Sequence, residues 1–214
     1  MKFPISSKKE YMQDKKIDYK SLSVVTLYSK MKPKEILYEL GEDELFRYTY
    51  QNKLKENKVE IEEFSNLKIA TIIKTINKLS KLDNNLINLY KTDLNEVVYY
   101  LNYCTMDEKQ YVLIEEEILK KLISIGNTSL IKTYVLLKYL CKNKYKRISR
   151  KFIASNIGLS TTKSSLDIIT DITNTLVDNN LIFKKYINTT INKSYIEYKV
   201  NSYDEWSKMN NIIE

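Results

Sequence analysis

Hydrophobic positions in the second half of the chain repeat with the spacing of α-helices. The segment 129–141 (SLIKTYVLLKYLC) has apolar residues at Leu130, Tyr134, Leu137 and Cys141, with further apolar residues between them. This pattern predicts a helix that is buried on most of its surface. The preceding break, 126–128, supplies its cap.

Two more helices are predicted downstream, separated by a tight turn. The first is the short segment RKFIASNIG, with Ser149 as N-cap and Gly158 at the end, where a left-handed residue is favoured. The second begins at 160–163 and stops at 178–180. The residues expected to face inward are Phe152, Ile153 and Ile157 on the short helix, and Leu166, Ile169, Ile172 and Leu176 on the longer one.

A β-hairpin is predicted after these helices. The runs 181–187 and 194–200 are rich in β-favouring residues and flank a polar, turn-rich stretch. The predicted order is therefore helix, short helix, helix and hairpin.

The first half contains a diverged echo of this order. Asp83-Asn84-Asn85-Leu86-Ile87 repeats residues 178–182 residue for residue, after a helical pattern at 69–79 and before a hairpin signal at 86–103. Upstream, 33–55 predicts a long or broken helix, and 62–66 is left for a middle helix. Either this half is a second copy of the same domain, or it is a helical dimerisation or packing domain that carries a hairpin.

We therefore expect a mainly α fold with β-hairpins, of the α+β class. A polar break at 105–110 separates a domain at 17–104 from a domain at 111–201, which is followed by a tail at 202–214. Residues 111–114 and a helix at 115–125 open the second domain.

The charge of the chain is unevenly distributed. Lys and Arg number 35 against 27 Asp and Glu, a net charge of +8, yet residues 118–166 contain eleven Lys or Arg and no Asp or Glu. Such one-sidedness is typical of a protein that binds a polyanion. The alternative is a basic surface that is merely solvated in a Lys-rich chain.

The composition argues against several classes of enzyme. The chain has no histidine, which removes the commonest general base and histidine metal sites. Three isolated glycines cannot form a phosphate-binding loop, and Cys104 and Cys141 lack metal-ligand spacing. We expect no enzyme activity, no cofactor and no metal. Without a run of about 20 apolar residues or a signal-peptide core, we also expect a cytoplasmic protein that does not enter a membrane.

The second half resembles the winged-helix family in its order of elements and in its turn I-x-x-x-x-G-L-S (153–160). With the first half, it resembles the tandem winged-helix replication initiators of low-GC bacterial plasmids and phages. The segments that carry this resemblance are 111–125, 129–141, 153–160, 179–182 and 195–206, with a looser likeness over 60–103. The resemblance implies a tandem winged helix-turn-helix protein that binds repeated origin sequences in double-stranded DNA. It also implies that the third helix lies in the major groove and that the hairpin, or wing, lies against the backbone or the minor groove.

Candidate DNA contacts follow from this arrangement. Asp167 and Asp171 would repel phosphates, so only the first turn of the third helix is expected to meet DNA. The expected contacts in the second half are Arg147, Arg150, Lys151, Thr161, Thr162, Lys163, Ser164, Ser165, Lys184, Lys185, Asn192 and Lys193, and those in the first half are Lys68, Thr71, Lys74 and Lys78.

The expected function is sequence-specific binding of double-stranded DNA by a protein of a mobile element, in replication initiation or its control. Expected partners besides DNA are a second copy of the chain and host replication proteins. A winged-helix transcriptional repressor and a winged-helix protein-interaction adaptor are the alternatives.

Overall fold

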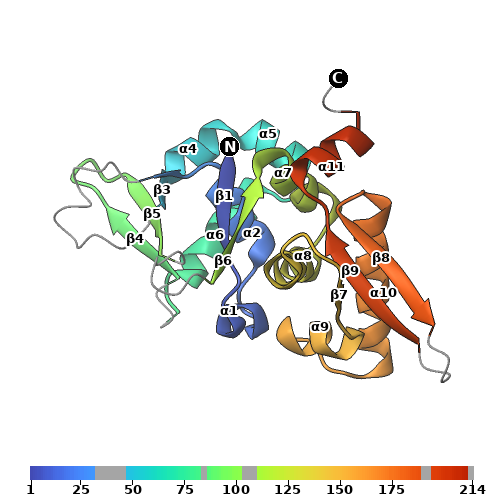
Figure 1. The fold of residues 1–214 in the computed structure, drawn as a ribbon. Helices are drawn as coiled ribbons and strands as arrows, with labels where there is room; N and C mark the ends of the chain where they lie inside the picture. Colours follow the sequence, from blue (N-terminus) through green and yellow to red (C-terminus); the bar gives the residue numbers. More distant parts are fainter. Residues whose placement is uncertain (32–46, 83–85, 103–109, 189–193, 212–214) are drawn as a thin grey trace. The chain divides into compact units, whose positions relative to one another are not determined.

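The computed structural model describes residues 1–31, 47–82, 86–102, 110–188 and 194–211, and its chain divides into two units (Figure 1). The first unit comprises Met1–Ser6 and Lys16–Gly126, and the second comprises Ser7–Lys15 and Asn127–Glu214. Both units combine helices with small antiparallel sheets, so the chain has the mixed α+β character that its sequence predicts.

The second unit runs helix, strand, two helices and a hairpin, and ends in a further helix. A three-stranded antiparallel sheet has the order β7-β9-β8, so β9 is its central strand. The elements are α8 (Thr128–Cys141), β7 (Lys146–Arg147), α9 (Arg150–Asn156), α10 (Lys163–Asp178), β8 (Ile182–Asn188), β9 (Ser194–Val200) and α11 (Tyr203–Met209), together with α1 (Lys9–Gln13).

Local signals in the sequence set the ends of these helices. The Asn127 side chain accepts a hydrogen bond from the Leu130 N–H, and Ser149 accepts one from the Phe152 N–H, each at 3.1 Å. Gly158 is left-handed, with φ +79°. The predicted caps, the predicted turn and the predicted hairpin are therefore confirmed.

The core of the second unit is built mainly by α8, α10 and the sheet. Ile153 and Ile157 are buried as predicted, but Phe152 is 45% exposed, so its inward assignment is wrong. Helix α9 has only seven residues, and Ile153 and Ala154 already occupy its inward side. On α10, Ile169, Ile172 and Leu176 are buried, whereas Leu166 is only partly so.

The expected tail contributes to this core. Helix α11 begins with a capping box made by Ser202 and Glu205. Trp206 is 3% exposed, and its indole N–H donates to the Asn179 carbonyl at 3.2 Å. Residues 203–209 are therefore a packed helix of the unit.

The first unit contains a four-stranded antiparallel sheet of order β2-β3-β5-β4 and a separate β1-β6 pair. Residues 111–125, expected to open the second domain, belong here as β6 and α7. The elements are β1 (Lys2–Ser6), α2 (Tyr19–Leu27), β2 (Lys30–Met31), β3 (Arg47–Tyr50), α4 (Gln51–Glu56), α5 (Lys58–Ser65), α6 (Ile69–Leu79), β4 (Ile87–Lys91), β5 (Val97–Leu101), β6 (Tyr111–Glu115) and α7 (Glu116–Ile125).

The helix expected at 33–55 is partly wrong. Residues 32–46 lie outside the described residues. Residues 47–50 form a strand that pairs with β5, with Arg47 and Thr49 buried and with Tyr48 and Tyr50 on the other face. Only 51–56 is helical in the rest of that range. The middle helix is longer than expected and spans 58–65. Helix α6 and the β4–β5 hairpin are confirmed.

The two units share several local features. The orders β3-β5-β4 and β7-β9-β8 correspond strand for strand. The Leu86 carbonyl accepts from the Asn102 N–H at 3.0 Å, and the Leu181 carbonyl accepts from the Asn201 N–H at 3.2 Å. These bonds close the two hairpins at the same point of the repeated sequence.

Among the described residues, no helix is both long and apolar enough to cross a membrane.

Gly158 offers a direct test of the packing of α1 in the second unit. A Cβ at Gly158 would lie 2.3 Å from the Gln13 carbonyl oxygen, and the left-handed backbone alone costs an L-residue about 1–2 kcal/mol. We therefore expect Gly158→Ala to lower the free energy of unfolding in urea by about 2 kcal/mol or more. Asn180→Gly, at another left-handed position, is the control and should change it by less than about 0.5 kcal/mol. Equal effects of the two variants would contradict this packing.

Candidate nucleic-acid interface

A pocket of about 370 Å³ lies where β7, the start of α9, the middle of α10 and the β8–β9 hairpin meet. Three of its lining side chains are cationic, and none is Asp or Glu. They are accompanied by hydroxyl and aromatic side chains. The lining residues are Arg147, Ile148, Ser149, Arg150, Thr170, Lys184, Tyr186, Ser194, Tyr195 and Ile196.

Arg150 is held against α10. It is the first residue of α9, directly after the Ser149 cap. Its Nη1 donates to Thr170 Oγ1 at 2.8 Å, and the Thr170 hydroxyl in turn donates to the Leu166 carbonyl at 3.0 Å. This chain of hydrogen bonds reduces the rotational freedom of the guanidinium before any ligand binds.

Aromatic rings hold the other cations near the pocket. The Arg147 guanidinium lies 4.4 Å from the centre of the Tyr195 ring, and Lys185 Nζ lies 3.8 Å from that of Tyr145. Lys184 Nζ lies 5.2 Å from the Tyr186 ring centre and also donates to Asn174 Oδ1 at 3.0 Å. Cation–π contacts of this kind favour a charged side chain in one place at little cost to its charge.

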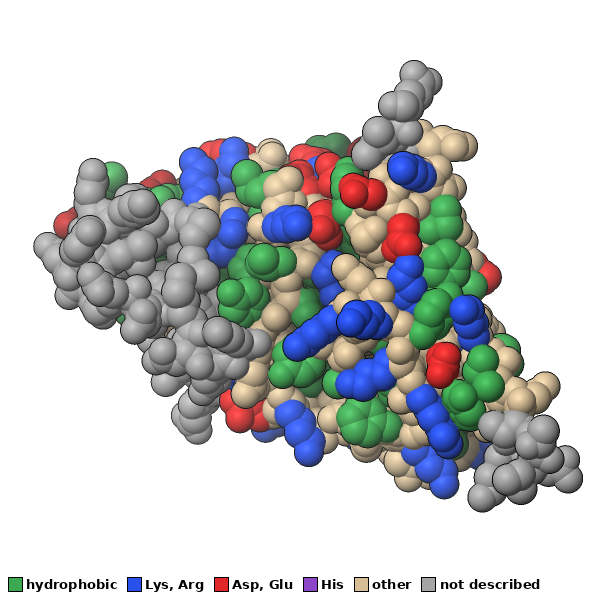
Figure 2. All heavy atoms as spheres, in the orientation of Figure 1, with side chains coloured by type: hydrophobic (Ala, Val, Ile, Leu, Met, Phe, Trp, Pro, Cys, Tyr) green, Lys and Arg blue, Asp and Glu red, His purple; other side chains and the backbone are tan. Residues whose placement is uncertain are grey.

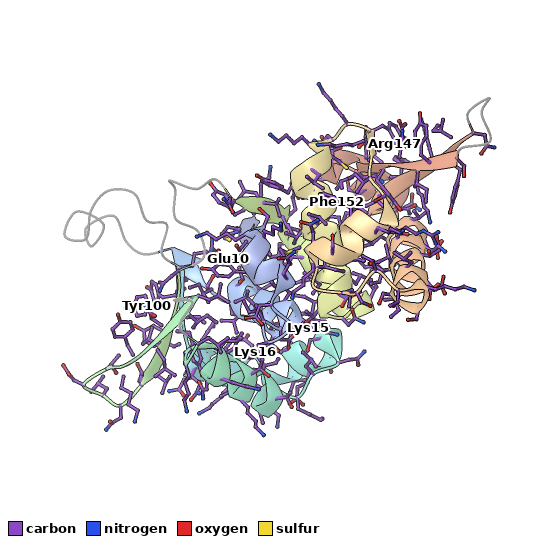
Figure 3. The ribbon with its side chains drawn as sticks, turned by 90° about the horizontal axis from the view of Figure 1, so that it is seen from below. Glu10, Lys15, Lys16, Tyr100, Arg147 and Phe152 are labelled. Atoms are coloured by element: carbon purple, nitrogen blue, oxygen red, sulfur yellow. The ribbon has the colours of Figure 1, made fainter. Side chains whose placement is uncertain are left out.

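The surface around the pocket is strongly basic. Lys and Arg side chains gather over α8, β7 and α9 on the face drawn in Figure 2, and Figure 3 labels Arg147 on this unit. Glu197 on β9 pairs in register with both Arg147 and Lys185 on the sheet. It does not line the pocket.

The beginning of α10 forms a separate group of expected contacts. Thr161, Thr162, Lys163 and Ser164 are exposed there and do not line the pocket. Ser165 is only 8% exposed, and its Oγ lies 2.7 Å from Ser160 Oγ, so the structure does not present it to a ligand.

Beyond its first turn, the outer face of α10 is acidic. Asp167, Asp171 and Asp178 are all exposed along it.

The remaining expected contacts of the second unit lie elsewhere. Lys151 is exposed on α9 but does not line the pocket. Asn192 and Lys193 lie outside the described residues.

Helix α6 of the first unit also carries exposed cations. Lys74 and Lys78 line an apolar-floored pocket of about 650 Å³ whose other lining residues are Gln51, Lys55, Ala70, Ile73, Asn77 and Lys81. None of these lining residues is acidic. Sequence reasoning missed Lys55 and Lys81, although Lys81 continues the spacing of Lys74 and Lys78.

The two other residues expected on α6 differ in their surroundings. Thr71 is exposed but does not line the pocket. Lys68 Nζ forms an ion pair with Glu62 at 3.3 Å. The Ile69 N–H and Lys68 together hold the pKa of the Glu62 carboxyl below its usual value, so part of the Lys68 charge is already offset.

No group of three or more His, Cys, Asp or Glu in the described ranges could hold a metal ion. Burial raises the pKa of the Cys141 thiol to about 11, so this thiol is protonated at neutral pH. Cys104 lies outside the described residues.

No protein-family model matches this chain, and no curated protein matches its sequence significantly.

The contact between Arg150 and Thr170 can be measured with a matched pair of variants. Thr170 and Thr175 both donate from Oγ1 to the carbonyl four residues earlier, but the structure gives only Thr170 a hydrogen bond from Arg150. We expect Thr170→Val to lower the free energy of unfolding by about 1 kcal/mol more than Thr175→Val does. In the Arg150→Ala background this difference should vanish. A difference that persists there would mean that Arg150 is not held by Thr170.

Proposed function

We propose that this chain is a non-enzymatic, sequence-specific double-stranded DNA-binding protein with two winged-helix units. The observation that carries the proposal is the pocket of the second unit, where Arg147, Arg150 and Lys184 converge without an acidic lining residue. DNA phosphates are the common polyanionic ligand for such an arrangement, and Arg matches their geometry well.

The charges of the pocket are pre-positioned, which favours binding. A flexible cation loses rotational freedom when it contacts a phosphate, and this loss opposes the gain in electrostatic energy. Hydrogen bonds and aromatic rings already restrict Arg147, Arg150 and Lys184. These side chains therefore lose less rotational freedom when they bind DNA.

The first turn of α10 supplies the second part of the proposed interface. Its exposed Thr161, Thr162, Lys163 and Ser164 surround the N-terminus of a 16-residue helix, where free N–H groups favour phosphate. Lys163 is the side chain proposed to reach a base edge, whereas Lys151, Lys185 and the wing contact the backbone.

Similarities between the units support a tandem arrangement. Each has two or more helices, then a left-handed residue, a further helix and a hairpin, and the strand order β3-β5-β4 corresponds to β7-β9-β8. The left-handed residue is Asn66 in the first unit and Gly158 in the second. In this proposal α6, with Lys74 and Lys78, is the counterpart of α10.

The proposed role is replication initiation, or its control, in a plasmid or phage. It rests on the resemblance to tandem winged-helix initiators and on the basic pocket, and it includes a homodimer and host replication proteins as partners. A winged-helix repressor would share the same DNA-binding surface. The acidic outer face of α10 favours a second candidate, a winged-helix protein-interaction adaptor, because Asp167, Asp171 and Asp178 would attract a basic protein surface.

Salt dependence of binding to duplex DNA tests the proposal. The logarithm of the affinity falls as the logarithm of the salt concentration rises, and each lost phosphate contact makes this negative slope less steep by about 0.9. We expect Arg147→Ala combined with Arg150→Ala to make the slope less steep by about two. The double variant should also weaken binding to random and to preferred duplexes alike, by at least about tenfold. Lys9→Ala combined with Lys208→Ala removes the same charge from exposed sites outside the pocket, and should leave the slope nearly unchanged.

Two outcomes would contradict the proposal. A full-length protein without measurable, salt-sensitive affinity for duplex DNA would favour the adaptor. Equal effects of the two double variants would mean that the pocket does not contact DNA.

The contribution of the first unit can be tested by footprinting. Two winged-helix units protect a longer site than one unit, with centres about one helical turn, or 34–36 Å, apart. We expect Lys74→Ala combined with Lys78→Ala to remove protection from one end of the site and to leave the other end protected. Lys53→Ala combined with Lys58→Ala, on α4 and α5, should leave its length unchanged. An unaltered footprint in the α6 variant would make the first unit a dimerisation or recruitment domain.

A further inference from the structure

The sheet of the first unit presents four tyrosines on one face. Residues directly opposite each other in neighbouring strands lie on the same face of a sheet. Tyr48 is opposite Tyr100, and Tyr50 and Tyr90 are both opposite Val98, so all four tyrosines share a face. We call Tyr48, Tyr50, Tyr90 and Tyr100 the tyrosine face; Figure 3 labels Tyr100 on it.

This face lies on the side of the sheet away from α6. The neighbouring Tyr99 points to the opposite side, where it is fully buried. Its hydroxyl donates to Asn77 Oδ1 of α6 at 2.9 Å and accepts from Gln51 Nε2 at 2.7 Å. Because successive residues of a strand alternate between faces, Tyr100 points away from the helix.

The four rings form a continuous aromatic surface. Ring centres are 4.9 Å apart for Tyr90 and Tyr100, and 6.0 Å apart both for Tyr48 and Tyr100 and for Tyr48 and Tyr50. Burial and the three neighbouring phenols raise the pKa of the Tyr100 hydroxyl. Tyr50 and Tyr90, at the two ends of the cluster, remain 39% and 55% exposed.

The charges around the tyrosine face are those that suit a polyanion. Strands β2, β3, β4 and β5 contain no Asp or Glu. Lys30 pairs in register with Tyr48 and is exposed on the same face. Lys91, at the end of β4, is exposed but pairs with Val97 and so belongs to the opposite face. Two acidic residues lie in the turn between β4 and β5: Asp93 is exposed, and Glu96 accepts from Asn52 Nδ2 at 3.5 Å.

The chemistry of the face fits nucleobases better than an apolar protein surface. Val98 is its central aliphatic residue, and it is only 4% exposed. The face offers aromatic rings with polar hydroxyl groups, next to the exposed Lys30. Proteins that hold single strands use this combination, because every base has a flat face that stacks on an aromatic ring while cations contact the phosphates.

We propose that the tyrosine face binds single-stranded DNA, with bases stacked on Tyr50 and Tyr90 and with Lys30 near the phosphates. This site goes beyond the proposed binding of duplex DNA and does not depend on it. Bases within a duplex are stacked on each other and do not offer their faces, so the ligand is an unpaired strand.

The test uses the full chain and a fluorescently labelled oligonucleotide of about twelve thymidines, which lies within the usual site sizes. Stacking of one base is worth about 1–3 kcal/mol, so Tyr50→Ala and Tyr90→Ala should each weaken binding about five- to a hundredfold in fluorescence anisotropy. Tyr50→Phe and Tyr90→Phe keep the ring and should remain within about twofold of the parent. Tyr139→Ala removes an equally exposed tyrosine from α8 and is the matched control.

Parallel titrations with duplex DNA separate this proposal from the previous one. We expect the tyrosine-to-alanine variants to bind duplex DNA as tightly as the parent. In the background of Arg147→Ala combined with Arg150→Ala, they should still weaken single-strand binding by the same factor. Far-UV circular dichroism and urea unfolding verify that each variant is folded.

Three results would overturn the proposal. The first is oligothymidine affinity that is absent, or unaffected by the alanine variants. The second is an equal loss of duplex affinity, which would assign the face to the duplex site. The third is a change from dimer to monomer in sedimentation without a change in single-strand affinity, which would make the face a contact between two copies of this chain.

Discussion

The central strand β9 determines where the cations of the second unit lie. It forms antiparallel hydrogen bonds with β7 on one side and with β8 on the other. Its Tyr198 is fully buried, and the Tyr198 carbonyl accepts a hydrogen bond from the Cys141 thiol at the end of α8. Because the strand is anchored to the core in this way, Arg147 from β7 and Lys184 from β8 are carried to fixed places beside α9 and α10. A shift of β9 by one residue would turn every one of its side chains to the opposite face and disperse the pocket.

A cluster of like charges opposes folding, and the second unit offsets this repulsion without acidic partners in the pocket. Arg150 is hydrogen-bonded to Thr170, Arg147 lies over Tyr195, and Lys184 donates to Asn174. Neutral partners restrict these side chains and leave their positive charge in place. A lining carboxylate would stabilise the cluster more strongly, but it would also cancel the field that attracts an anion. The composition of the pocket is therefore better suited to binding than to stability.

The two units share a helix followed by a hairpin but present different surfaces. Both carry a hairpin closed by the same backbone hydrogen bond, at Leu86 and at Leu181. Helix α6 exposes Lys74 and Lys78, whereas α10 exposes Asp167 and Asp171 at its outer side. The sheet of the first unit carries the tyrosine face, and the sheet of the second unit carries Arg147 and Lys185 on the strands that flank β9. The proposed duplex site on the second unit and the proposed single-strand site on the first unit rest on these different side chains.

Features that depend on neighbours along the chain could be predicted from the amino-acid sequence. The caps at Asn127 and Ser149, the left-handed turn at Gly158, the apolar faces of α6 and α10 and both hairpins follow from local spacing and residue type, because the interactions that form them span only a few residues. The basic character of residues 118–166 was equally visible, and so were Arg147, Arg150 and Lys184 as candidates. Long-range packing, by contrast, brings these three side chains into one pocket that Lys151 does not line, and it buries Ser165 while leaving Phe152 exposed. The pairing of β1 with β6, more than 100 residues apart, and the strand at 47–50 were also beyond sequence reasoning. Local preference is weak in such short segments, and the partner strand that decides their conformation lies far away in the chain. The same long-range register placed four tyrosines from three separate segments on one face of a sheet, which no local pattern records.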